Sequence, residues 1–301
     1  MLLYAWFCLG VICLGAPLLY FTYMRRKVSK PWNLKTDPHY APSVSIIIPT
    51  YNEEKTIQHK LQNLEHLDYP KSSIQVIVVD SASTDSTLEE IKEYGKRNSR
   101  LEIVTIKENE RRGKSKALNL ALQHTRGEII VVSDADCFWP SKILRQSLPY
   151  LANSSIGAVA GQEKLLNPEQ SWVTRTEDLY RDQAFKIQLG ESKFYSTVHF
   201  EGGFGAYRRE ALDQFDVETG SDDSGTALNL IQKGLRTIVL PEAVFYTFFP
   251  PSWKGKLTIK IRRAKQFVRI WCKCLRLMVR GQLALAKRIF APQAFLLLIN
   301  P

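Results

Sequence analysis

Asp134 and Asp136, two aspartates with one residue between them, have the types and spacing that most clearly suggest chemistry in this chain. They follow the apolar run 128–132, which is typical of a buried strand. Carboxylates at the end of such a strand lie at the sheet edge where open α/β sheets usually bind ligands. Hard oxygen ligands suit Mg²⁺ or Mn²⁺, which commonly also hold substrate phosphates. A turn or a helix cap is the alternative interpretation.

A second acidic pair, Asp222 and Asp223, stands where a helical pattern begins. Gly234 marks the end of that pattern, as glycine often does at a helix C-terminus. A carboxylate beside a helix N-terminus stays ionised, because the helix dipole favours negative charge there. From the residues alone, capping of this helix is the better interpretation, and service as a general base is the alternative.

The charge of the chain is distributed unevenly. The formal net charge is +11, yet no acidic residue follows Glu242, whereas lysines and arginines recur throughout the C-terminal segment. The surplus of positive charge therefore lies in that segment, and the rest of the chain is close to neutral. A basic block of this kind indicates nucleic acid, anionic lipid or a phosphorylated substrate as a partner.

Apolar runs alternate with helical patterns along the chain. Strands are predicted at 44–49, 74–80, 101–106, 128–134, 157–161 and 237–240. Helical patterns separate the first four, which favours a mostly parallel sheet covered on both faces. A charged helix is predicted at 169–190. The stretch 201–207 is too rich in glycine for a helix and suggests backbone that approaches another group closely.

Residues 1–24 contain no charged side chain. As a helix, this segment would be about 36 Å long, which is enough to cross a bilayer. Arg25, Arg26 and Lys27 follow directly, and positive residues favour the cytoplasmic side. The sequence therefore predicts a transmembrane anchor at 1–24, a basic linker at 25–43, and an integral protein of the cell membrane whose bulk faces the cytoplasm. A buried apolar helix is the alternative.

A long basic helix is predicted after Pro251. Its apolar and basic side chains recur at the same spacing on nearly opposite faces. The apolar stripe consists of Ala264, Phe267, Val268, Trp271, Leu275 and Met278. This pattern is typical of a helix lying in a membrane interface, and a helix docked on the domain is the equal alternative. We therefore separate a domain at 44–250 from a basic amphipathic, membrane-associated segment at 251–301, and we expect membrane lipids and no nucleic acid as partners.

A series of short strings resembles the motifs of family 2 glycosyltransferases, in particular the membrane-embedded cellulose synthase-like and hyaluronan synthase-like branch. The strings are PTYNE (49–53), VVDSASTD (78–85), GKSKALN (113–119), DAD (134–136), EGGF (201–204), SDD (221–223) and QFVRIW (266–271). Each could arise by chance, but their order is specific. The resemblance implies a GT-A type α/β fold, a mostly parallel sheet flanked by helices that binds a nucleotide diphosphosugar.

The resemblance also implies roles for single residues. It implies that Asp134 and Asp136 bind a Mn²⁺ or Mg²⁺ ion, which stabilises charge on the departing diphosphate. Asp223 becomes the catalytic base for an acceptor hydroxyl, and Asp222 orients the site. The donor-binding residues would be Pro49, Thr50, Tyr51, Glu53, Asp80, Lys114, Asp134, Gln266 and Arg269. The acceptor-binding residues would be Gly202, Gly203 and Trp271.

The last string departs from the family pattern, because Ile270 stands between Arg269 and Trp271. Gln266 and Trp271 are then five residues apart, about 140° around a straight helix. A one-residue bulge would restore a shared face, and we prefer this interpretation. In the other, Trp271 belongs to the apolar stripe and does not line the acceptor site.

Together these features predict a membrane-bound, metal-dependent, inverting glycosyltransferase. It would move a hexose from a nucleotide diphosphate sugar to a hydroxyl of a lipid-linked glycan, with GDP-mannose as the preferred donor and UDP-sugars open. A processive polysaccharide synthase of the cellulose, hyaluronan or chitin synthase type is one alternative, although a single span is few for a polymer channel. An inactive scaffold that binds sugar nucleotides is the other, and the intact acidic pairs argue against it.

Overall fold

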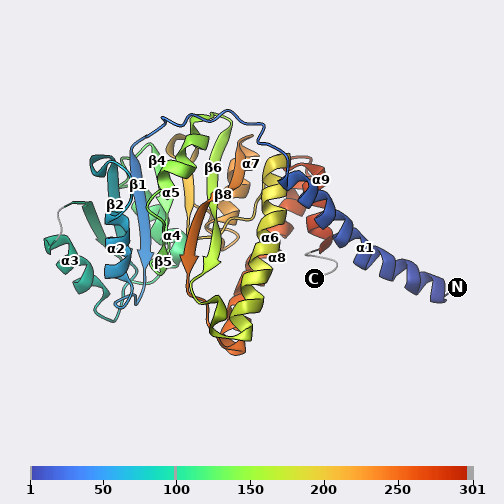
Figure 1. The fold of residues 1–301 in the computed structure, drawn as a ribbon, viewed down its shortest axis with the longest axis horizontal. Helices are drawn as coiled ribbons and strands as arrows, with labels where there is room; N and C mark the ends of the chain where they lie inside the picture. The colour runs from blue at the N-terminus through green and yellow to red at the C-terminus, as the bar shows by residue number, and fades with distance from the viewer. Residues whose placement is uncertain (1, 98–99, 297–301) are drawn as a thin grey trace.

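The computed structural model describes residues 2–97 and 100–296, and within 2–12 it describes only the backbone except at Tyr4. Its centre is a sheet with the strand order β3-β2-β1-β4-β7-β6-β8-β5 (Figure 1). The strands are β1 (Val44–Thr50), β2 (Ile74–Asp80), β3 (Glu102–Lys107), β4 (Ile129–Val132), β5 (Cys137–Phe138), β6 (Ile156–Leu165), β7 (Gly205–Arg208) and β8 (Arg236–Thr247). The helices are α1 (Leu2–Val28), α2 (Ile57–Glu65), α3 (Thr87–Arg97), α4 (Lys114–Leu122), α5 (Ile143–Ser147), α6 (Trp172–Phe194), α7 (Ser224–Gln232), α8 (Trp253–Val279) and α9 (Lys287–Ala294).

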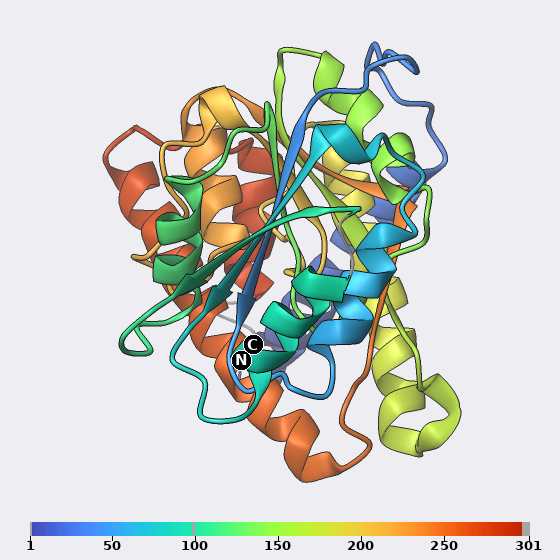
Figure 2. The same ribbon diagram turned by 90° about the vertical axis from the view of Figure 1, so that its left-hand side faces the viewer.

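The strands β1 to β4 form the parallel half of the sheet, with β1 between β2 and β4. Helices cover both sides of this twisted sheet (Figure 2). Ile46 and Ile48 of β1 pack into the apolar cluster that contains α2, whereas Ile47 packs into the cluster that contains α4. A strand buried on both faces needs apolar residues at every position, which is why the sequence shows continuous apolar runs here. The predicted parallel sheet is confirmed.

The other half of the sheet is mixed. β7 is antiparallel to both β4 and β6, and β6 runs parallel to β8. β8 extends from Arg236 to Thr247 and is longer than the predicted strand at 237–240. Its pairing with β6 is irregular between Ala160 and Gln162, where a side chain at Gly161 would collide with the backbone of Ala243. Because this irregularity and the exposed side chains of β8 interrupt its apolar pattern, the sequence indicated only the strand at 237–240.

The helix α1 projects from the domain, and its C-terminal half packs on α6 (Figure 1). Tyr20 and Met24 are buried there, and a Cβ at Gly190 of α6 would lie 2.5 Å from the carbonyl oxygen of Met24. Within the described residues, the structure has no helix that is both long and apolar enough for a membrane span. The predicted transmembrane anchor at 1–24 and the integral location in the cell membrane are therefore wrong. The apolar residues Tyr20 and Met24 pack on protein instead.

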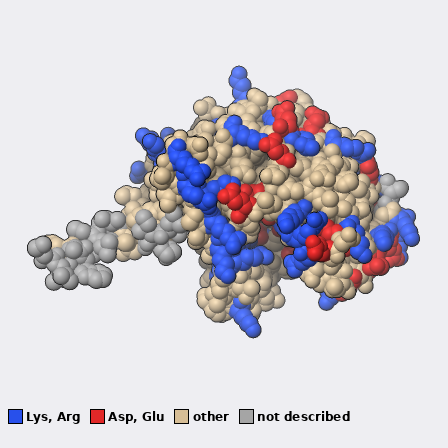
Figure 3. Space-filling model, turned by 180° about the vertical axis from the view of Figure 1, so that it is seen from behind, with Lys and Arg blue, Asp and Glu red and all other residues tan. Residues whose placement is uncertain are grey.

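The helix α8 is α-helical without interruption from Trp253 to Val279, so the preferred one-residue bulge is absent. Its predicted apolar stripe is divided between two sides. Phe267 and Trp271 pack toward the domain, whereas Val268 and Leu275 are exposed. Seen from behind, Lys and Arg side chains form a band over the face where α8 lies (Figure 3). The end of the predicted segment 251–301, residues 297–301, lies outside the described residues.

Candidate active site

A cavity of about 610 Å³ opens beside the carboxyl ends of the parallel strands. The predicted site residues that line it are Pro49, Glu53, Lys114, Asp134, Asp136, Gly202, Asp222, Asp223 and Gln266. The predicted site residues outside this lining are Thr50, Tyr51, Asp80, Gly203, Arg269 and Trp271. The fold therefore gathers both acidic pairs and the lysine of the GKSKALN string into one space.

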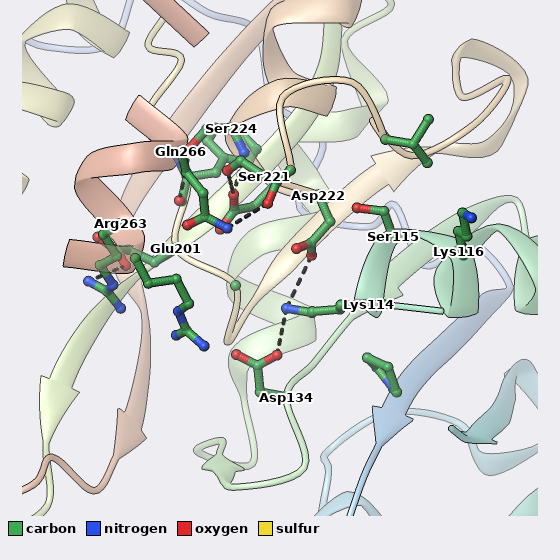
Figure 4. A pocket seen from close by; sticks show the side chains of 18 of the residues that line it. Lys114, Ser115, Lys116, Asp134, Glu201, Ser221, Asp222, Ser224, Arg263 and Gln266 are labelled. Carbon is green, nitrogen blue, oxygen red and sulfur yellow. Dashed lines mark hydrogen bonds and ion pairs between the residues drawn. The ribbon is translucent and has the colours of Figure 1, made fainter. Parts of the chain in front are cut away.

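Lys114, the first residue of α4, lies between the two acidic pairs. Its Nζ is 2.6 Å from Oδ1 of Asp134 and 3.1 Å from Oδ2 of Asp222 (Figure 4). Gly113 takes a positive φ of 98°, which lets the chain turn directly into the helix. Burial works to lower the pKa of Lys114, but the carboxylates of Asp134, Asp222 and Asp223 hold it well above its usual range. Lys114 is therefore a permanent cation at the centre of the cavity.

Gly202 marks the point where these groups converge. A Cβ at this position would lie 2.9 Å from Nζ of Lys114, 3.2 Å from Oδ2 of Asp134 and 3.6 Å from Oδ2 of Asp223. Only glycine leaves this space free for another group. Glycine is required at position 203 for a different reason, since a side chain there would collide with the ring of Phe245.

Asp223 is both a helix cap and a cavity residue. Its Oδ1 accepts hydrogen bonds from the backbone N–H of Ser224 at 2.6 Å and from the hydroxyl of Ser221 at 2.5 Å. Its Oδ2 is the oxygen that faces Gly202. The two interpretations of the acidic pair are thus compatible, since each uses a different oxygen. Burial raises the pKa of the neighbouring Asp222 to about 6, against the opposing influence of Lys114.

The carboxylates of Asp134 and Asp136 fit a divalent cation that is shared with a substrate. Burial, together with the nearby carboxylates of Asp134 and Glu53, raises the pKa of Asp136 to about 6, which indicates a site where negative charge is in excess. No group of three or more His, Cys, Asp and Glu side chains suited to a metal ion occurs among residues 2–97 and 100–296. Two carboxylates alone would leave the other positions around such an ion to water and phosphate oxygens, as is usual for Mg²⁺.

Lys60 of α2 supports the turn that follows Asp136. Its side chain is completely buried, its Nζ donates to the carbonyl oxygen of Cys137 at 2.8 Å, and it lies 4.0 Å from the centre of the Trp139 ring. The Trp139 indole N–H in turn donates to the carbonyl oxygen of Gly203 at 2.8 Å. Burial lowers the pKa of Lys60 to about 8. Sequence analysis did not select Lys60, because a lysine between apolar positions of a helix is usually exposed.

Asp80 ends β2, and Tyr51 directly follows β1. Asp80 is almost completely buried, and its Oδ1 has no hydrogen-bond partner in the part of the chain that the structure describes. A buried carboxylate oxygen without a donor is costly, so it is suited to receive an N–H of a ligand. The guanidinium of Arg111, which lines the cavity, lies 3.9 Å from the centre of the Tyr51 ring. The hydroxyl of Thr50 is used internally, since it donates to the carbonyl oxygen of Val79.

The predicted residues of α8 contact the segment before Asp222. Gln266 lines the cavity and donates from Nε2 to the carbonyl oxygen of Gly220 at 2.5 Å. The guanidinium of Arg269 lies against Gly220, 3.1 Å from the position of a Cβ there. Trp271 faces the other way, completely buried between the rings of His199 and Phe290. The structure does not bring Trp271 to the cavity, because in a straight helix it lies on a different side from Gln266.

Glu201 and Arg263 also line the cavity, and sequence analysis did not select them. Their side chains form an ion pair of 3.3 Å, and Arg263 lies 3.6 Å from the buried Glu163 (Figure 4). Burial raises the pKa of Glu201 to about 7, although Arg263 opposes this shift. The signal for Glu201 was its place in the EGGF string, where only the glycines drew attention.

Comparison with known proteins agrees with this geometry. Residues 45–215 match the family model described as Glycosyl transferase family 2. The probable glycosyltransferase YdaM of Bacillus subtilis (strain 168) is 29% identical over 71% of this chain and 52% of its own length. Beta-monoglucosyldiacylglycerol synthase of Nostoc sp. is 31% identical over 60% of this chain and 40% of its own length. The chain thus spans about half the length of these relatives or less.

Solved structures show the same fold. Mannosyltransferase PcManGT from Pyrobaculum calidifontis, in complex with GDP-Man and Mn²⁺, is 35% identical with a TM-score of 0.85, over 98% of this chain and 81% of that one. S. aureus TarS in complex with UDP-GlcNAc, at 21% identity and a TM-score of 0.60 over 84% of this chain and 72% of that one, shares the fold alone. The predicted GT-A type fold is confirmed. Because the family model matches more than half of its length, this chain belongs to glycosyltransferase family 2.

Proposed function

We propose that this protein is an inverting mannosyltransferase that takes mannose from GDP-mannose and transfers it to a hydroxyl of a lipid-linked glycan. The convergence of Lys114, Asp134 and Asp223 around Gly202 carries the proposal, because one cavity then offers a cation, a metal-binding carboxylate and a base. The similarity to a mannosyltransferase that binds GDP-Man and Mn²⁺ supports the donor. A relative named for a glucosyldiacylglycerol product supports a lipid-bearing acceptor.

The geometry supports a direct displacement at the anomeric carbon. Asp134 and Asp136 would hold Mn²⁺ or Mg²⁺, which when bound stabilises charge on the departing diphosphate. Lys114 donates to the same phosphates from the adjacent wall. Oδ2 of Asp223 takes the proton of the acceptor hydroxyl, whose oxygen forms the new bond while the diphosphate leaves with its electron pair. Ser221 and Ser224 hold Oδ1 and so fix the direction of that carboxylate.

Contact with lipid is part of this proposal, as is membership of the cellulose synthase-like and hyaluronan synthase-like branch. The helix α8 exposes Leu257, Ile261 and Val268 at spacings of four and seven, so they share one side. All charged residues of α8 are basic. An exposed apolar side with basic neighbours suits anionic lipid. The division into a catalytic domain at 44–250 and a lipid-contacting segment at 251–301 follows from the same proposal.

A thermal-shift comparison of nucleotide sugars with Mn²⁺ tests the donor. GDP-mannose should raise the melting temperature more than UDP-glucose or UDP-N-acetylglucosamine, since a ligand at a hundred times its Kd adds about 2.7 kcal/mol of stability. A larger shift with a UDP-sugar would reject GDP-mannose as the donor. Product length measured on a lipid-linked acceptor then separates addition of one sugar from polymerisation.

A further inference from the structure

A second cavity, a groove of about 650 Å³, lies between α1 and α9. Pro17, Leu19 and Tyr20 contribute from α1, and Ala291 and Phe295 from α9 and the residue after it. These walls offer a ligand almost exclusively apolar surface. The groove is separate from the active-site cavity, with which it shares no lining residue.

The two walls of this groove are held by one buried carboxylate. Glu191 of α6 is completely buried, and its Oε1 accepts hydrogen bonds from the hydroxyl of Tyr20 at 2.5 Å and from Nε2 of Gln293 at 2.6 Å. Its Oε2 accepts from the hydroxyl of Thr197 at 2.6 Å. Since a buried carboxylate is costly without such donors, these bonds fix α1 and α9 relative to α6. The groove is therefore a built feature of the fold.

Basic side chains stand at one end of the groove. Lys287 and Arg288 line it where α9 begins, both are exposed, and neither forms an ion pair within the described part of the chain. An apolar groove that ends in two available cations is complementary to a hydrocarbon chain that carries an anionic head. A neutral apolar partner would leave these cations unused.

Ring contacts lead from α9, which forms one wall of the groove, to the active-site cavity. Phe290 of α9 contacts Trp271, which contacts His199, which in turn contacts Phe267, with ring centres 6.0, 5.9 and 5.2 Å apart. Phe267 lines the active-site cavity next to Gln266. Phe290, Trp271 and His199 line neither cavity, so this row of rings leads from α9 to the part of the active-site cavity near Gln266.

We propose that this groove binds the hydrocarbon chain of the lipid phosphate that carries the acceptor, with the phosphate at Lys287 and Arg288. The inference rests on the proposed function, which supplies a lipid-linked acceptor. It goes further in naming where the lipid is held and which residues recognise it.

Binding of soluble alkyl phosphates to the full chain, below their micelle concentrations, tests the groove. Decyl phosphate should bind about 15-fold more tightly than octyl phosphate, because each buried methylene contributes about fourfold. Ala291→Trp, which fills the groove from an exposed position, should weaken decyl phosphate binding at least tenfold. The double variant K287E/R288E should weaken decyl phosphate much more than decanol. Leu179→Glu, at an exposed position of α6 that lines neither cavity, is the matched control and should bind as the wild type.

Several outcomes would overturn the inference. Equal affinities for the two chain lengths, or wild-type binding by Ala291→Trp, would show that the groove does not hold the chain. Equal weakening by Leu179→Glu and Ala291→Trp would show that the loss of binding is not specific to the groove. Mn²⁺-dependent binding of GDP-mannose, measured on each variant, verifies the fold. Failure of the wild-type protein to bind GDP-mannose would reject the proposed function, whether or not the groove binds decyl phosphate.

Discussion

Replacing Asp223 by asparagine separates the tasks of its two carboxylate oxygens. Asparagine keeps an acceptor for the backbone N–H of Ser224 and the hydroxyl of Ser221, which Oδ1 of Asp223 serves in the structure. The group facing Gly202 becomes an amide, which cannot take a proton from an acceptor hydroxyl. We therefore expect the Asp223→Asn protein to fold normally, bind the donor and fail in transfer.

The two effects differ enough in size to be distinguished. Aspartate and asparagine cap helices about equally well, so the free energy of unfolding should change by less than about 1 kcal/mol. A positioned general base contributes about 10²- to 10⁴-fold to the rate, equivalent to about 3 to 5 kcal/mol. Transfer should therefore fall by about 10²-fold or more.

Asp222→Asn is the matched control. This change removes the ion pair with Lys114, but Lys114 keeps its contact with Asp134 at 2.6 Å. We expect the transfer rate to fall less than about tenfold, because the amide oxygen can still accept from Nζ of Lys114 and one hydrogen bond is worth about 0.5 to 1.5 kcal/mol. Calorimetric titration with GDP-mannose and Mn²⁺ measures donor binding, and initial rates of mannose transfer measure catalysis. A wild-type rate for Asp223→Asn, or a greater loss for Asp222→Asn, would refute the assignment of the base.

Further predictions concern the turn that follows β4 and carries Asp134 and Asp136. The Mn²⁺ affinity of the wild type should fall about tenfold per pH unit below about 6, because a proton competes with the cation for Asp136. Calorimetry of Asp136→Asn should show no such pH dependence. A wild-type affinity that stays the same from pH 5 to 8 would contradict this prediction. The stability of the metal-free protein should change with pH in the opposite direction. Because the pKa of Asp136 in the folded protein lies above its usual 3.8, ionisation of this group lowers the free energy of unfolding as pH rises from about 4 to 6. Lys60→Met should keep or raise the melting temperature at pH 7, because burial of the charged amine is a cost when its pKa falls from 10.5 to about 8. The same variant should weaken Mn²⁺-dependent donor binding about 10- to 100-fold, since the turn after Asp136 loses its support; wild-type affinity would show that Lys60 is only structural. Stability of the wild type should also rise between pH 8 and 10.5 as the amine loses its proton, and the methionine variant should lack this rise.

The uncharged N-terminal run shows where sequence analysis fails for a physical reason. Apolar side chains are required both by a helix that spans lipid and by one that packs on protein, so composition cannot separate them. Tyr20 and Met24 became buried against α6 only because Gly190 allows the backbone of Met24 to approach. The same ambiguity affected α8, whose periodicity revealed an apolar stripe but not which part of it docks.

The sequence by itself determined the parallel half of the sheet and the residues delivered to its edge. β1, β2 and β4 are buried on both faces, so their apolar runs are continuous, and the acids and glycines that follow them stand out locally. Only the tertiary structure decided that Lys114 lies between Asp134 and Asp222, that Trp271 faces His199, and that Glu191 fixes two distant helices. These contacts join segments that are far apart in the chain, and local periodicity carries no information on which helix face meets which partner.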